Sequence, residues 1–393
     1  MVRRTFFLFL LISLSSVAFG QEKSLPELGH GITNAVAKDS SFSTVVTASM
    51  QGRYHLLYDA ENLEHSFFIR RARLYFDGFV YQPNITYKFE LAFSNHDIRG
   101  SSYYTGDQPQ IIYDALLMWE FTKGWKLFAG QGKLPGNAER VFSASNMQLI
   151  DRSLLNAYYN IDRDLGFQLH QSYTLPFDGI FRSKWALTQG EGRNIVVGNL
   201  GGLQYTGRLE YLPFGRFTGG SPFSGSDVER ESSPKLLIGY TYNFNDDAVR
   251  DRGTLGSFME LGNGVLHTSD ISTQFLDLIF KYQGASVLLE YAHRAATNPD
   301  IIDVNGTIQG YVYTGSALNA AGGLMISEKN EIALRYTRVS EQTDQLQLLE
   351  QYTFGFNRFL VGHSFKIQTD LNYTLNNLDS PYWELRSGFE LHF

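Results

Sequence analysis

The sequence lacks several features that would assign it to common classes of protein. It contains no cysteine, so it can form no disulfide framework and offers no acylation site for a lipoprotein. After residue 20 it has no uninterrupted apolar run of roughly 18 residues, which excludes a transmembrane helix there. An excess of basic charge is also missing. The formal net charge is -7, and this mildly acidic balance disfavours a nucleic-acid partner.

The common short catalytic and cofactor motifs are absent as well. The sequence has no Walker A loop, no G-x-S-x-G and no H-E-x-x-H. Its nine histidines are scattered, with no pair at ligand spacing on a shared polar face. The acidic run at 243–247, followed by Asp251, lacks the spacing of a calcium loop and is interpreted as a solvated loop. We therefore expect no cofactor, no metal site and no enzymatic activity.

Aromatic residues, in contrast, are abundant, and the last segment shows how they are used. Aromatics make up 15% of the chain, with 23 Tyr and 30 Phe. From residue 382 to the end, an apolar set alternates with a polar, charged set. The apolar set is Trp383, Leu385, Phe389, Leu391 and Phe393; the other includes Glu384, Arg386 and Glu390. Such strands are typical of transmembrane β-barrels, in which apolar side chains face lipid and polar ones face the lumen. The terminal Phe393 resembles the assembly signal of outer-membrane proteins.

The N-terminus is also consistent with a protein of the outer membrane. Arg3 and Arg4 precede an apolar stretch at 6–14, and Ala18-Phe19-Gly20 forms a small-x-small cleavage site. This pattern predicts a secretory signal peptide at 1–20. Residues 21–41 carry no strand pattern and are predicted to be a periplasmic N-terminal stretch, followed by a barrel over 42–393. The expected location is the bacterial outer membrane.

Segments with alternating apolar and polar residues recur along the chain and predict an all-β, antiparallel transmembrane barrel of about 16 strands. The predicted strands are 43–58, 66–77, 83–93, 110–121, 125–131, 164–173, 180–189, 203–212, 235–244, 273–282, 285–293, 308–318, 331–339, 348–358, 363–374 and 382–393. An even number places both termini in the periplasm, so odd connections are outer loops and even ones periplasmic turns. The even connections are short, except 213–234, whose length the pattern does not explain.

One outer connection is predicted to enter the pore. Residues 133–162 lack clean alternation, and residues 140–157 look partly helical. We expect this segment to fold inward as a constriction loop, since large barrels can be narrowed by inserted segments. An ordinary surface loop is the alternative interpretation.

Three arginines lie close together in the second predicted strand. If Arg71 and Arg73 face the lumen, Arg70 falls on the lipid side. There it would cost roughly 2–4 kcal/mol at mid-membrane. Arg70 must then lie near an interface, or a bulge shifts the register. The same reading places Phe68, Ala72, Leu74 and Phe76 toward lipid. The arginines could alternatively pair with carboxylates and rigidify the wall.

At this strand the chain resembles the phosphate-selective porin O and P family. The resemblance rests on Arg70-Arg71-Ala72-Arg73-Leu74 with Phe76-Asp77-Gly78 and 87–93, and on Gly130-Gln131-Gly132-Lys133-Leu134-Pro135, Asp151-Arg152-Ser153-Leu154 and Arg163-Asp164-Leu165-Gly166. Where members tend to read Lys-x-Pro-Phe-Gly, this chain has Lys133-Leu134-Pro135-Gly136-Asn137.

The resemblance implies a homotrimeric outer-membrane channel, surrounded by lipid, with basic side chains that attract small anions. Matching the motifs position by position makes Arg71, Arg73 and Lys133 the best candidates, followed by Arg152. The strand faces add Arg53, Lys88, Arg182 and Lys184 to the predicted lumen. Acidic residues on the same faces are nearly as numerous as basic ones, so the wall composition alone does not predict an anion filter.

Two other functions remain open from the sequence. A specific uptake channel for oligosaccharides or other nutrients could use the aromatic loop Ser102-Tyr103-Tyr104 to stack sugars. An outer-membrane hydrolase would need a small cluster near the outer rim, to which His170 and His293 could belong. Enzymatic barrels usually have fewer strands than this one, which disfavours the hydrolase.

Overall fold

A computed structural model describes residues 28–393 except 30, 60–61, 99, 263 and 343–345. The predicted signal peptide, residues 1–20, lies outside the described residues. No helix in the described ranges is long and apolar enough to span a membrane.

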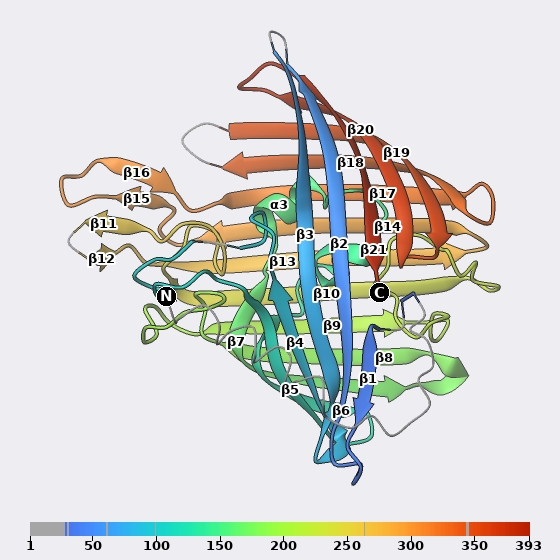
Figure 1. The fold of residues 1–393 in the computed structure, drawn as a ribbon. Helices are drawn as coiled ribbons and strands as arrows, with labels where there is room; N and C mark the ends of the chain where they lie inside the picture. The colour runs from blue at the N-terminus through green and yellow to red at the C-terminus, as the bar shows by residue number, and fades with distance from the viewer. Residues whose placement is uncertain (1–27, 30, 60–61, 99, 263, 343–345) are drawn as a thin grey trace, which may run out of the picture.

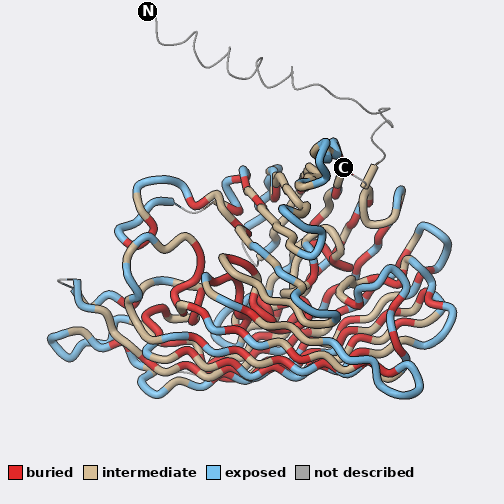
Figure 2. The backbone as a smooth tube through the Cα atoms, turned by 90° about the horizontal axis from the view of Figure 1, so that it is seen from below, coloured by how far each residue is buried: buried red, intermediate tan, exposed pale blue. Residues whose placement is uncertain are grey.

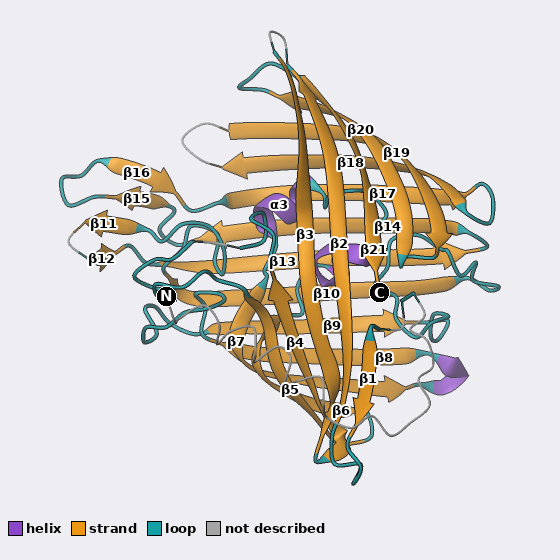
Figure 3. Ribbon diagram, in the orientation of Figure 1, coloured by secondary structure: helices purple, strands orange, loops and turns teal. Residues whose placement is uncertain are grey.

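The described chain folds into a closed antiparallel barrel (Figures 1 and 3). Its main sheet has 17 strands, of which the short β1 (Thr33–Val36) is an addition and the other sixteen form the wall. The wall strands are β2 (Ser43–Tyr58), β3 (Leu63–Val80), β4 (Gln82–Ala92), β5 (Ile112–Thr122), β6 (Trp125–Lys133), β7 (Arg163–Thr174), β8 (Ile180–Thr188), β9 (Gln204–Leu212), β10 (Lys235–Ala248), β13 (Ser269–Tyr282), β14 (Ala285–Ala296), β17 (Thr314–Met325), β18 (Asn330–Gln342), β19 (Leu346–Val361), β20 (Phe365–Asn376) and β21 (Tyr382–His392). Pairing of β2 with β21 closes the ring, so no wall strand keeps an open edge along this ladder.

The two faces of the wall differ as the alternation predicts. On β9, Leu209 and Tyr211 are exposed on the outside, whereas Arg208 and Glu210 are buried inside. Figure 2 shows buried positions alternating with exposed and intermediate ones along the strands. The outer face therefore presents apolar side chains to lipid, and the charged side chains fill the interior.

The predicted fold class and strand positions are confirmed, except that one predicted wall strand is wrong in part. The segment predicted as a strand at 308–318 splits in two. Its first part is β16 (Ile308–Tyr311), which pairs with β15 (Asp300–Ile302) in an outer hairpin. The wall strand β17 begins only at Thr314. The alternation continues across the junction, so periodicity alone could not reveal where the chain leaves the hairpin.

The stretch predicted to have no strand contains β1. It pairs with residues 43–46 of β2, a part of β2 that β21 does not reach. The last bonds between β2 and the C-terminus join Ala48 and Phe393. β1 therefore continues the ladder where β21 stops. Four residues are too few for alternation to be recognised in the sequence.

A bulge in β3 decides the direction of Arg70. Gln51 pairs with Arg71, but the next residue, Gly52, pairs with Ile69, so Arg70 is the extra residue. The bulge turns Arg70 inward, where its guanidinium lies 3.6 Å from Asp97. A bulge was one of the two predicted solutions, and the structure adopts it.

The same bulge makes one prediction wrong. Phe68 was expected to face lipid, but its ring lies 5.8 Å from the guanidinium of Arg53 and stacks on His96 inside the barrel. Phe67 takes the outer position instead and is 78% exposed. A single extra residue reverses the faces of every residue beyond it.

The connections follow the predicted parity. At the end that carries the C-terminus, most turns are short; the turn at 175–179 holds a 3₁₀-helix (Pro176–Asp178). At the other end several connections are long. They include the β15–β16 hairpin, a second hairpin of β11 (Glu260–Gly262) and β12 (Val265–Leu266), and residues 134–162 with α2 (Ala138–Val141), a 3₁₀-helix (Ala144–Asn146) and α3 (Leu154–Tyr159).

Gly78 tests how closely the first wall strands approach one another. A Cβ atom at this position would lie 1.9 Å from the backbone oxygen of Ser43. Because backbone cannot rotate aside, we expect Gly78→Ala to lower the free energy of unfolding by about 1–3 kcal/mol. The measurement is the urea midpoint of the folded barrel in detergent. Gly198→Ala is the control, because nothing lies within 4 Å of a Cβ there. Equal midpoints for both variants would contradict the close approach.

Candidate functional site

The candidate site forms where residues 134–162, hereafter the constriction loop, cross the lumen. The loop bonds to widely separated wall strands. Thr241 of β10 donates to the Pro135 carbonyl at 3.2 Å, and Lys366 of β20 donates to the Met147 carbonyl at 2.5 Å. In Figure 1, α3 lies within the ring of strands. The predicted inward folding of this loop is therefore confirmed.

Apolar side chains anchor the loop in an otherwise polar interior. Leu155 and Tyr159 of α3 are fully buried in a cluster that includes Phe275 and Val339 of the wall. The hydroxyl of Tyr159 also donates to the Thr314 carbonyl at 3.0 Å. Burying a Leu or Tyr side chain stabilises by about 1.5–3 kcal/mol, so these contacts fix the position of the loop.

A carboxylate fastens the two halves of the loop to each other. Glu139 in α2 accepts hydrogen bonds from the backbone nitrogen of Ser153 at 2.9 Å and from its hydroxyl at 2.6 Å. Ser153 is also the N-cap of α3, since its side chain accepts from the Asn156 nitrogen. The Asp-Arg-Ser-Leu motif thus starts a helix and closes the loop at the same time.

Asp151 ties the loop to the strands that close the barrel. Its carboxylate lies 2.5 Å from Arg53 of β2 and 3.2 Å from Arg386 of β21. Arg70 approaches it at 4.0 Å. Burial by itself would raise the pKa of Asp151, but Arg386, Arg53 and Arg70 outweigh it and hold that pKa well below its ordinary value. Arg53, a predicted lumen residue, thus serves to hold the loop.

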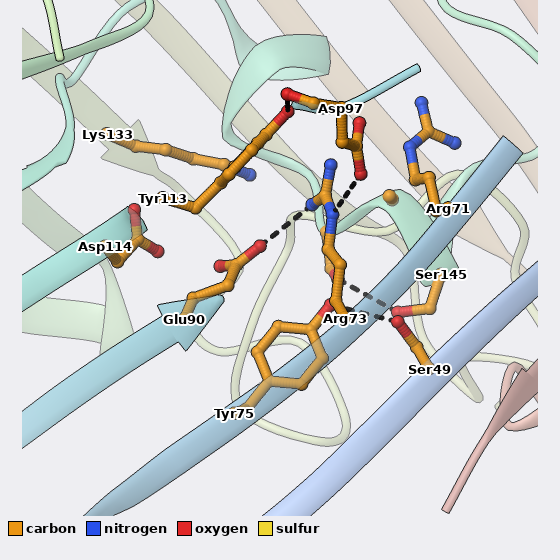
Figure 4. Close-up of polar contacts among 12 residues, drawn as sticks. Ser49, Arg71, Arg73, Tyr75, Glu90, Asp97, Tyr113, Asp114, Lys133 and Ser145 are labelled. Carbon is orange, nitrogen blue, oxygen red and sulfur yellow. Dashed lines mark hydrogen bonds and ion pairs between the residues drawn. The ribbon is translucent and has the colours of Figure 1, made fainter. Parts of the chain in front are cut away.

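Arg73 belongs to a dense network at the side of the loop. Figure 4 shows its guanidinium between Glu90, at 2.8 Å, and Asp97, at 2.7 Å. Lys88, another predicted residue, lies 2.7 Å from Asp114 and 3.2 Å from Glu90. These two predicted cations are neutralised by carboxylates, as the wall-stiffening alternative proposed.

The network also contains cations that the sequence did not single out. Arg163 lies 2.5 Å from Asp114 and 3.3 Å from Glu90. The ring of Tyr113 lies 4.6 Å from the guanidinium of Arg163 and 4.4 Å from that of Arg73, both within cation–π range. Arg163 begins β7 inside one of the motifs quoted above. Besides the adjacent Asp162, its charge partners come from other strands and leave no trace in local spacing.

Lys133, Arg152 and Arg71, hereafter the basic cluster, differ from these neighbours. Lys133 donates to the Phe142 carbonyl at 2.9 Å, and Arg152 donates to the same oxygen at 3.0 Å. Arg71 donates to the side-chain oxygen of Gln51, and its Nε is buried without a partner. Within the described residues, no carboxylate lies at ion-pair distance from any of the three cations.

The basic cluster is crowded with like charge. Burial lowers the pKa of Arg152 well below its ordinary value, and the charges of Arg140 and Arg71 lower it further. Arg140 does have a counter-ion, because it forms an ion pair with Asp162. The arrangement thus concentrates positive charge next to the inserted loop.

The remaining predicted cations lie on another part of the wall. Lys184 is 2.5 Å and Arg182 is 3.6 Å from Glu210. Arg208 shares this carboxylate at 2.8 Å and binds Asp277 at 2.6 Å. The predicted residues therefore divide into paired wall cations and the three members of the basic cluster.

Comparison with known proteins finds a family match within the first part of the chain. Residues 48–208 match the family described as phosphate-selective porin O and P. The match confirms the resemblance predicted from the motifs, and it includes all three members of the basic cluster. Curated proteins, in contrast, give no match to the chain.

Solved porins share the fold. An OmpF of Salmonella typhi in complex with daunomycin has a TM-score of 0.58 at 11% identity, covering 92% of this chain and 100% of that one. An anion-selective porin from Comamonas acidovorans has a TM-score of 0.54 at 10% identity, covering 90% and 100%. OmpT of Vibrio cholerae, in a trimer form, has a TM-score of 0.52 at 12% identity, covering 89% and 99%. The family match and this barrel make the protein an outer-membrane porin, a channel for small solutes and ions.

The residues that the sequence offered for a hydrolase do not come together, and those offered for an oligosaccharide channel lie in an outer loop. His170 is bonded to Gln168 and packs on Phe128, whereas His293 is exposed on the outer face of β14. Tyr104 packs on Phe258 at 4.0 Å, and Tyr103 is 81% exposed. The two histidines therefore do not share a site, while Tyr103 is accessible at the outer end of the barrel.

The Asp97 carboxylate gives the network a pH dependence. Burial would raise its pKa, but Arg73, supported by Arg71 and Arg70, outweighs burial and lowers the pKa to about 2. A lowered folded-state pKa stabilises the fold above the ordinary value of 3.8, and this contribution is lost as the pH falls toward 2. We expect the porin to lose about 2 kcal/mol from this group over that interval.

Denaturant midpoints measured in detergent at several pH values test this prediction. Asp97→Asn is expected to be less stable at neutral pH, because Arg73 loses a partner, and to show a smaller further loss in acid. Asp107→Asn is the control, because Asp107 is exposed in the same 93–111 connection between β4 and β5. It should follow the wild-type curve. A wild-type acid loss that Asp97→Asn does not reduce would contradict this assignment.

Proposed function

We propose that this porin conducts anions in preference to cations and that phosphate-like anions bind at the basic cluster. The observation that carries the proposal is that the half-buried Lys133 and Arg152 share one carbonyl oxygen, and that neither they nor the buried Arg71 has a carboxylate partner among the described residues. Their paired neighbours contribute little net charge. These three residues thus add unpaired positive charge beside the loop that narrows the lumen.

The partners of the cluster support anion binding. Carbonyl oxygens position Lys133 and Arg152 but carry no net charge, so they orient the cations without neutralising them. In a partly desolvated passage the repulsion among the cations is strong, and an entering anion would relieve it. A guanidinium can offer two parallel donors to phosphate, which favours tetrahedral oxyanions over chloride.

The comparisons support the proposal from another direction. The matching family is described as phosphate-selective, and the Comamonas acidovorans neighbour is described as anion-selective. The nearly equal numbers of acids and bases along the strands do not oppose it, because most of these acids form pairs with wall cations. Selectivity depends on the charges left over where the path is narrowest.

Reversal potential in a KCl gradient across a planar bilayer tests the proposal. Wild-type channels should favour chloride. Lys133→Gln should reduce the chloride-to-potassium permeability ratio about sevenfold, since one unit charge at about 7 Å in water favours chloride and disfavours potassium by about 0.6 kcal/mol each. The control is Lys126→Gln, which removes a half-exposed lysine at the start of β6, beside the 123–124 turn. Cation preference in the wild type would end the proposal.

Added phosphate separates a phosphate site from a general preference for anions. Millimolar phosphate should reduce chloride current through the wild type, because a bound oxyanion occupies the passage. The block should weaken in Arg152→Gln and Lys133→Gln and persist in Lys126→Gln. Equal block in all four proteins would place phosphate binding elsewhere.

We also propose the homotrimer and the surrounding outer-membrane lipid implied by the family resemblance. The trimer form of Vibrio cholerae OmpT supports this assembly by analogy of fold. The mass of the folded protein in detergent, measured by light scattering, would identify a monomer if the proposal is wrong.

A further inference from the structure

The connection between β9 and β10, residues 213–234, is long at the end of the barrel where the other turns are short. The structure accounts for this length, because the segment folds back into the barrel. Phe217 is buried in an apolar cluster with Phe142 of the constriction loop and Leu237 of the wall. We call residues 213–234 the inner turn.

The inner turn meets the constriction loop inside the lumen. The backbone nitrogen of Gly225 donates to the Asn146 carbonyl at 2.8 Å. A Cβ atom on Gly225 would lie 2.6 Å from the backbone nitrogen of Gln148, so the two backbones are in direct contact. Two segments that enter from opposite ends of the barrel therefore touch within it.

Carboxylates fasten the base of the inner turn. Asp227 accepts from the Gly284 nitrogen, in the turn between β13 and β14, at 2.7 Å. Glu231 accepts from the nitrogen and the hydroxyl of Thr218 at 2.6 and 2.9 Å. Farther in, Ser226 donates to Glu331 of β18 at 2.7 Å. The turn is thus attached to the wall at several points.

The tip of the inner turn is uncharged. Residues 217–226 contain no Asp, Glu, Lys or Arg. Phe223 places its ring 5.0 Å from the Lys184 ammonium and 5.9 Å from the Arg208 guanidinium, and so covers these paired wall cations. Ser224 accepts from Lys281 of β13 at 2.6 Å. The tip occupies space in the lumen and adds no charge to it.

We propose that the inner turn forms a second constriction, which enters the lumen from the end of the barrel that carries the C-terminus. This constriction limits conductance and solute size without selecting the sign of charge. Charge selection remains with the basic cluster at the constriction loop. The inference rests on the porin fold and goes beyond the proposed anion preference, because the two properties can be measured separately in one bilayer recording.

The first test shortens the tip by deleting residues 221–225. Single-channel conductance should rise roughly twofold, because the deletion widens the path, while the reversal potential in a KCl gradient should not move. The matched control deletes residues 304–306 from the tip of the outer β15–β16 hairpin, where Val304 is 76% exposed, and should leave conductance unchanged. Folding of each variant is checked by heat-modifiable migration.

A second variant decides the question if the shortened protein does not fold. The native chain has no cysteine, so Ser224→Cys supplies a single thiol. A neutral bulky reagent attached before refolding should lower conductance at least roughly twofold, because it fills the same passage. The control is Ser327→Cys, in the short turn between β18 and its neighbour β17, labelled in the same way.

The outcomes are distinct. Higher conductance after shortening, or lower conductance after labelling Ser224→Cys, supports the proposal when the reversal potential is constant. Folded, labelled Ser224→Cys with wild-type conductance overturns it. A shifted reversal potential in the shortened variant overturns the assignment of charge selection to the basic cluster alone. Failure of the anion preference in the wild type would leave these conductance results unaffected.

Discussion

The ion pairs of Asp151 connect the two constraints on which this porin depends. One constraint is closure of the sheet, which requires β2 to pair with β21. The other is the position of the constriction loop. Asp151 belongs to the loop, and its partners Arg53 and Arg386 belong to those two strands. Buried ion pairs stabilise little when formed from water, but loss of one partner leaves a buried charge that costs several kcal/mol. The loop therefore cannot leave the lumen without leaving Arg53 of β2 without its carboxylate, although Arg386 keeps Asp370 of β20 at 2.7 Å.

The interior is best understood as a division between paired and unpaired cations. A count of the acidic and basic residues on the inner face gives an almost neutral wall. Such a count does not say which cation lies beside which carboxylate. The structure places Glu90, Asp114 and Glu210 against wall cations. The loop then brings Lys133 and Arg152 to one carbonyl oxygen, away from carboxylates. A nearly neutral lumen can thus contain a locally positive passage, because pairing is decided by contacts between distant parts of the chain.

Much of the fold was predictable, because a strand that separates lipid from water must alternate its side chains. The strand positions and the parity of the connections followed from that single rule. The direction of Phe68 did not, since one bulged residue at Arg70 reverses the faces beyond it and leaves no mark on composition. The inner turn was visible only as an unexplained length. Its contacts with Asn146 and Gln148 join residues almost 80 positions apart, which local pattern cannot report.

For the candidate site, the motifs named the right segment of the chain but could not rank its residues. Arg73 and Arg71 are two positions apart on one strand and look equivalent in sequence. Arg73 meets Glu90 and Asp97, whereas Arg71 meets the neutral side chain of Gln51. This difference arises because Glu90 belongs to β4 and Asp97 to the 93–111 loop. Both carboxylates take their positions beside Arg73 only after the barrel has closed.

The ladder between β2 and β21 also has a kinetic consequence. Ser49 pairs with His392, so the first wall strand waits for the last residues of the chain before its edge is covered. Contacts of such long sequence separation form slowly, because the entropy of closing the loop must be overcome before any pairing is gained. During this interval β2 is an open edge, and the adjacent β1 can protect only its first four paired residues. Closure of this barrel therefore depends on its C-terminal strand, and until that strand pairs, the rest of the β2 edge stays uncovered.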